Sequence, residues 1–81
     1  RVLLWGYRWM MRLFEDACRD LLRQPPQARS SWLEQRTQGN PAARALLLPV
    51  LDRFAGQAFD DLALPLAWCR RWASTIHPNE R

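Results

Sequence analysis

Tryptophan and arginine side chains recur near the start of the sequence at spacings that bring them together on a helix. Trp5 and Trp9 are separated by four positions, and Arg8 and Arg12 each follow one of them by three. Residues three and four apart are neighbours on a helix, so each guanidinium can stack on an indole. Both residue types are enriched at the centres of protein–protein interfaces. We therefore predict that Trp5, Arg8, Trp9 and Arg12 bind a partner, and we call these four residues the Trp/Arg face.

A second aromatic and basic cluster, Trp68-Cys69-Arg70-Arg71-Trp72, lies near the end of the sequence. Interleaved residues of these types can stack on bases and contact phosphates. On a helical wheel, however, both tryptophans fall on the apolar side while Arg70 and Arg71 point outward, so ordinary amphipathicity explains the pattern. The two arginines would join Arg8 and Arg12 in a basic patch if the first and last helices are neighbours.

The residue types that perform catalysis or bind metals are few and poorly spaced. His77 is the only histidine, Cys69 precedes it by two helical turns and Cys18 is remote, whereas a zinc site needs four ligands, usually in close pairs. Ser74 and His77 lie one turn apart but lack an orienting acid and an oxyanion hole. The three glycines form no phosphate-binding loop. We therefore predict no catalytic residue, no metal site and no cofactor.

The two cysteines leave two interpretations open. Two cysteines this far apart in sequence do not form a disulfide framework. In a reducing cytosol we expect two buried thiols. If the first and last helices pack together, a Cys18–Cys69 disulfide is the alternative.

The element that would position the Trp/Arg face is a long amphipathic helix over residues 2–23. Apolar residues recur there at steps of three and four, the period of one helical face; its buried centre is predicted to comprise Leu3, Tyr7, Met10, Phe14 and Leu21. The solvent face of the same helix is predicted to comprise Arg8, Arg12, Glu15, Asp16 and Arg19. Trp5 falls within that polar face and Trp9 at its edge, which is why we assign them to binding.

Residues that cap or interrupt helices predict three further helices. Pro25-Pro26 ends the first helix, and Ser31 with Glu34 reads as a capping box for a short helix over residues 32–37. Asn40-Pro41 starts a helix over 41–56 that is apolar on nearly every side and that Pro49 would kink. Asp60-Asp61 is a capping region before a helix over 62–76.

These elements predict an all-α fold, a small compact bundle of three longer helices and one short helix. Residues 1–81 are expected to be a single helical domain, excised from a longer protein. The longest apolar runs, such as Ala45–Leu51, are far shorter than the roughly 20 residues that cross a bilayer.

Composition and charge narrow the set of functions that the chain could have. The net charge is +4 and every basic residue is arginine, a bias typical of GC-rich coding, so we expect a bacterial, cytoplasmic protein. We predict a non-enzymatic docking or self-association module that binds another protein or a second copy of itself. The alternatives are nucleic-acid binding through an arginine patch and peripheral membrane association through the first helix. A helix-turn-helix is disfavoured, because the last helix begins with apolar residues.

Overall fold

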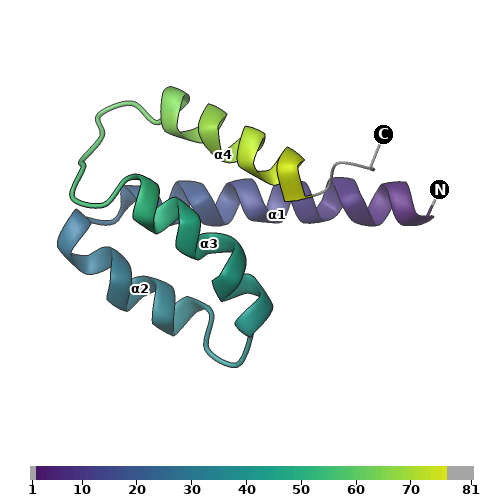
Figure 1. The fold of residues 1–81 in the computed structure, drawn as a ribbon, viewed down its shortest axis with the longest axis horizontal. Helices are drawn as coiled ribbons and strands as arrows, with labels where there is room; N and C mark the ends of the chain where they lie inside the picture. Colours follow the sequence, from purple (N-terminus) through teal and green to yellow (C-terminus); the bar gives the residue numbers. More distant parts are fainter. Residues whose placement is uncertain (1, 77–81) are drawn as a thin grey trace.

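The computed structural model describes the backbone of residues 2–76 and the side chains of residues 12–76. Its elements are α1 (Val2–Arg23), the 3-10 helix η1 (Pro26–Ala28), α2 (Arg29–Arg36), α3 (Pro41–Arg53) and α4 (Ala63–Ile76). Helix α1 contacts α2, α3 and α4, and its N-terminal part extends past the ends of the other helices (Figure 1). No strand occurs between residues 2 and 76. The predicted all-α bundle is therefore confirmed.

Helix α1 has the bounds and the amphipathic character that the sequence predicts. Leu21 and Leu22 are buried and Phe14 is half-buried, whereas Arg12 and Asp16 are exposed. The predicted polar residues Glu15 and Arg19 are half-buried, because α4 packs against this side of α1. The side chains of Leu3, Tyr7 and Met10 lie outside the described residues.

The predicted start of the second helix is wrong by three residues. Helix α2 begins at Arg29, directly after η1, and its N-cap residue Ala28 makes no side-chain hydrogen bond. Ser31 is therefore an interior residue of the helix and cannot cap it, so the predicted capping box is absent. The Glu34 carboxylate instead accepts a hydrogen bond from Arg44 Nε, at 2.8 Å. The 3-10 turn after Pro25 supplies the helix start that we had assigned to Ser31.

Helix α3 begins as predicted and is not divided by its proline. The Asn40 side chain accepts a hydrogen bond from the Ala43 amide at 3.1 Å, and Pro41 occupies the first turn. Pro49 lies within the helix, which continues to Arg53, three residues short of the predicted end. A turn follows and closes at Gly56, whose φ of 79° favours glycine.

Helix α4 presents an apolar stripe to the core. Asp61 Oδ1 accepts a hydrogen bond from the Ala63 amide at 2.8 Å, which confirms the predicted capping region. Leu66, Cys69 and Ala73 are buried, and Arg70 and Arg71 are exposed. Trp68 and Trp72 flank the stripe and pack against the core.

Among the residues whose side chains are described, the core contains one charged side chain, Arg29, which is only 1% exposed. Its guanidinium donates to the carbonyls of Leu22, Gln24 and Phe54, at 3.1, 3.1 and 3.0 Å. These carbonyls lie at or beyond the C-terminal ends of α1 and α3, where helices leave acceptors unsatisfied and where a positive charge is favoured. Burial lowers the pKa of Arg29. Arg29 therefore joins two helix ends to the start of α2.

None of the helices within the described part of the chain combines the length and the apolar character needed to cross a membrane.

Candidate interaction surface

An exposed apolar side chain marks the part of α1 that the other helices leave open. Leu13 is 51% exposed, whereas the next residue, Phe14, is half-buried. It follows Trp9 by four residues, as Trp9 follows Trp5, and so continues the same row along α1. This row, Trp5–Trp9–Leu13, runs from the projecting end of α1 towards the bundle.

An apolar groove adjoins this row where α1 meets α3. Its volume is about 300 Å³, and apolar side chains form most of its lining, namely Leu13, Phe14, Ala17, Ala42, Ala43, Leu46 and Leu47. We call it the α1–α3 groove. Leu13 belongs both to the groove and to the row that contains the two tryptophans. Apolar grooves with few polar groups suit the side chains of another protein.

Of the four residues predicted to form the Trp/Arg face, the structure places one side chain. Arg12 is exposed on α1 and lines a shallow hollow of about 260 Å³ with Glu15, Asp16 and Arg19. The side chains of Trp5, Arg8 and Trp9 lie outside the described residues. Their backbone belongs to the projecting part of α1.

A glutamate that we had assigned to the solvent face joins α1 to α4. The Glu15 carboxylate accepts hydrogen bonds from Arg70 Nε and Nη2 at 3.1 and 2.8 Å, and from Arg19 Nη2 at 3.1 Å. Arg19 Nη1 also donates to Asp16 at 3.2 Å. The hydrogen bonds from Arg70 lower the pKa of Glu15, partial burial opposes this, and the charges of both arginines reinforce it. Glu15 is thus held ionised between two guanidinium groups.

The proposed basic patch is altered by this pairing. Helices α1 and α4 are neighbours, as that patch requires. Arg71 is exposed, but Arg70 forms its two hydrogen bonds with Glu15, which also raise the pKa of Arg70. The positive charge of Arg70 is therefore matched within the fold. A phosphate backbone would have to compete with Glu15 for it.

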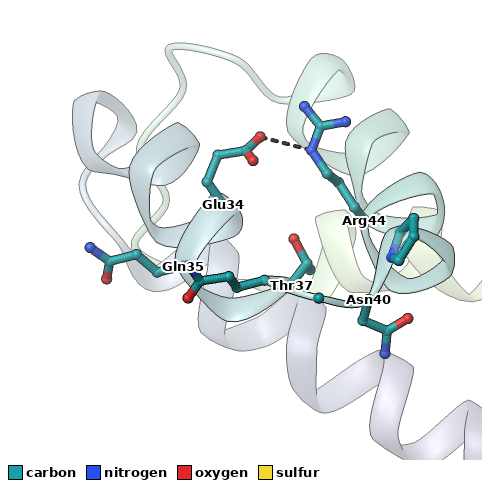
Figure 2. A pocket seen from close by; sticks show the side chains of 8 residues that line it. Glu34, Gln35, Thr37, Asn40 and Arg44 are labelled. Carbon is teal, nitrogen blue, oxygen red and sulfur yellow. Dashed lines mark hydrogen bonds and ion pairs between the residues drawn. The ribbon is translucent and has the colours of Figure 1, made fainter.

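A second, polar hollow of about 500 Å³ lies between α2 and α3 (Figure 2). The ion pair of Glu34 and Arg44 links the two helices beside it, at 2.8 Å. Two further polar groups in its lining serve the fold: Thr37 Oγ1 donates to the Leu33 carbonyl at 2.7 Å, and Asn40 caps α3. Among the described residues of this hollow, no buried side-chain polar atom lacks a partner that a ligand could supply.

The described residues contain no group of three or more histidine, cysteine, aspartate and glutamate side chains arranged to hold a metal ion. Ser74 is exposed and donates to the Arg70 carbonyl at 3.1 Å. His77, its potential partner, lies outside the described residues. Cys18 and Cys69 are buried free thiols, as one of the two sequence interpretations expected.

The sequence analysis missed Leu13 and the role of Glu15. For Leu13 the signal was present, because its spacing from Trp9 repeats that of Trp9 from Trp5. For Glu15 no local signal existed, since its main partner lies 55 positions away in the chain.

Comparison with family models, with curated proteins and with solved structures found no match.

Proposed function

We propose that this chain is a non-enzymatic protein-interaction module. Its partner docks along α1, on the Trp/Arg face and in the adjoining α1–α3 groove. Aromatic and aliphatic side chains anchor the partner, while Arg8 and Arg12 meet its acidic or carbonyl groups.

The observation that carries the proposal is the exposure of Leu13, 51%, at the rim of an apolar groove. A leucine this exposed is unremarkable alone. Here it lines a 300 Å³ apolar groove, and it follows Trp9 by four positions on a helix that extends past its neighbours (Figure 1). Exposed apolar surface beside such a groove is typical of protein-binding sites.

Charge favours an acidic partner over a second copy. The chain has a net charge of +4, and Arg12 is exposed beside the row. Two copies docked through this surface would bring like charges together, which opposes association. An acidic segment with apolar anchors, such as an amphipathic helix laid along α1, would satisfy both parts of the surface.

Nucleic-acid binding receives less support. Pairing of Arg70 with Glu15 leaves fewer unmatched cations for phosphates. That alternative predicts an affinity that falls steeply with salt, whereas apolar docking predicts a weak dependence on salt.

The direct test places a photoreactive benzoylphenylalanine at position 13 in cells that naturally produce the protein. The matched control carries the same group at position 64, since Leu64 is 83% exposed at the start of α4, outside the proposed surface. We expect a discrete adduct from position 13 that disappears when Trp5 and Trp9 are both replaced by alanine. Equal adducts from both positions, or none from position 13, would contradict the proposal.

Purified variants then measure the contribution of Leu13 to binding of the cross-linked partner. Leu13→Gln should weaken binding at least about tenfold, because a buried leucine at an interface contributes about 1.5–3 kcal/mol. Leu64→Gln should bind as the natural chain does. An adduct between two copies would identify self-association, which sedimentation equilibrium would show as a dimer lost in Leu13→Gln.

A further inference from the structure

Two cysteines that are remote in sequence meet inside the bundle. Cys18 lies in α1 and Cys69 in α4, both are 0% exposed, and both belong to the same core cluster. The two helices pack against each other. Each thiol is the largest influence on the pKa of the other, as expected for neighbouring groups in one core cluster.

Of the two buried cysteines, Cys69 lies beside a cavity. A cavity of about 230 Å³ borders Cys69 and is otherwise lined by Phe14, Glu15, Arg70 and Ser74. Its volume accommodates several water-sized molecules. Cys18 does not line this cavity, so Cys69 is the cysteine nearer to a small reagent that enters it.

The surroundings shift the pKa values of the two thiols in opposite directions. The neighbouring Cys18 thiol lowers the pKa of Cys69; burial and Glu15 oppose this shift, and Arg70 favours it. The neighbouring Cys69, together with burial, raises the pKa of Cys18. Cys69 is therefore the sulfur that carries thiolate character, and Cys18 keeps its proton until a second step requires it.

We propose that Cys18 and Cys69 form a redox modification site that a small hydroperoxide converts into a disulfide between α1 and α4. The inference concerns a different part of the chain from the docking surface and does not depend on it.

The chemistry takes two steps with hydrogen peroxide as oxidant. Cys69 Sγ attacks one peroxide oxygen, the O–O bond breaks, and the leaving hydroxide takes the former Cys69 proton to form water, which leaves a sulfenic acid. Cys18 Sγ then attacks Cys69 Sγ, the S–O bond breaks, and the departing oxygen takes the Cys18 proton and leaves as a second water. The two thiols lose two electrons and two protons, and the peroxide is reduced to two waters.

The consequence is a covalent link between the middle of α1 and α4. The cross-link closes a long loop of the chain, which lowers the entropy of the denatured state and so stabilises the fold, the more so the longer the loop. For a domain of this size we expect the melting temperature to rise by about 10 °C or more on oxidation.

The test uses the full chain, first reduced and freed of reductant, then treated with hydrogen peroxide and quenched with catalase. Intact-mass and peptide analysis should show the loss of two hydrogens and a Cys18–Cys69 linked peptide in monomeric protein. The melting temperature should rise and return to its original value with dithiothreitol. A disulfide between two copies, sulfinic acid on either cysteine without a linked peptide, or no reaction of the folded chain would overturn the proposal.

Two variants test the order of the steps, with circular dichroism to establish that each is folded. In Cys18→Ser, dimedone should trap a sulfenic acid on Cys69, since no second thiol resolves it. In Cys69→Ser, Cys18 should be trapped at least about tenfold more slowly, because it lies behind the cavity. Equal trapping rates would refute the assigned roles, and the wild-type mass analysis tests the disulfide even if a variant does not fold.

Discussion

The two parts of α1 whose side chains are described, Arg12–Ala17 and Cys18–Arg23, share one helix but have different surroundings. In the second part Cys18, Leu21 and Leu22 are buried, and Arg29 bonds the last turn to α2 and α3. In the first part Leu13 is half exposed, and the main links to α4 are hydrogen bonds at the surface.

The difference arises from the neighbours rather than from the helix itself. Both parts carry apolar residues at the same helical period. The second part lies where the ends of α1 and α3 and the start of α2 converge, so its apolar face is covered. The first part is flanked by α3 and α4, and on its α3 side the α1–α3 groove stays open. Periodicity defines a face, but the arrangement of the other helices decides whether that face stabilises the fold or stays available to a partner.

The largest effect should follow removal of Arg29. Arg29→Met leaves the three carbonyls that it serves without this buried donor, which should cost about 3 kcal/mol or more of unfolding free energy. Arg36→Met, on the exposed end of α2, should cost less than about 1 kcal/mol. Urea denaturation followed by circular dichroism measures both. Similar losses in the two variants would contradict the role assigned to Arg29.

Matched leucine truncations compare the two parts of α1 directly. Leu21→Ala should lower the unfolding free energy by about 3 kcal/mol, because it opens a cavity in the core. Leu13→Ala, two turns away, should change it by less than about 0.5 kcal/mol. Urea midpoints of the two variants provide the measurement. A loss of more than about 1.5 kcal/mol in Leu13→Ala would place that side chain in the core and remove the main support for the docking surface.

A smaller, pH-dependent effect should follow replacement of Glu15. Because its pKa is lowered in the folded state, its ion pairs stabilise the fold at neutral pH. This contribution is lost as the pH falls from the range where free glutamates titrate down through the lower pKa of folded Glu15. Glu15→Gln should therefore cost about 1 kcal/mol at pH 7, and the difference from the natural chain should shrink steadily as the pH falls below that range. Thermal melts at several pH values would show this.

Glu34→Gln is the control, since Glu34 forms a single, exposed pair with Arg44. It should cost less than half as much at pH 7. An undiminished difference between Glu15→Gln and the natural chain at pH 3 would show that the carboxylate acts through packing rather than through its charge.

Local signals were sufficient to predict most of the fold. The period of apolar residues predicted α1, the Asn40-Pro41 pair predicted the start of α3, and Asp61 predicted that of α4, because each signal acts over a few residues. The start of α2 was mispredicted because Ser31 and Glu34 match a capping pattern that the turn at η1 makes unnecessary.

Features that join remote segments were not predictable in the same way. Nothing local distinguishes Arg29 from the exposed arginines, since its acceptors include Phe54, 25 positions away. The pairing of Glu15 with Arg70 and the proximity of Cys18 to Cys69 both depend on the packing of α1 against α4. The sequence analysis could consider that packing but could not predict it. The candidate surface was predicted as a row of residues on one helix; its continuation into the α1–α3 groove required the position of α3.

The three hydrogen bonds of Arg29 also imply the order in which they can form during synthesis of the chain. Its acceptors at Leu22 and Gln24 are 7 and 5 positions away, whereas Phe54 is 25 positions away. During synthesis the first two can be engaged as soon as the chain has turned after α1, and the third must wait until α3 has emerged from the ribosome. A hairpin of α1 and α2 would then hold a guanidinium with an unused N–H, ready to receive the end of the next helix.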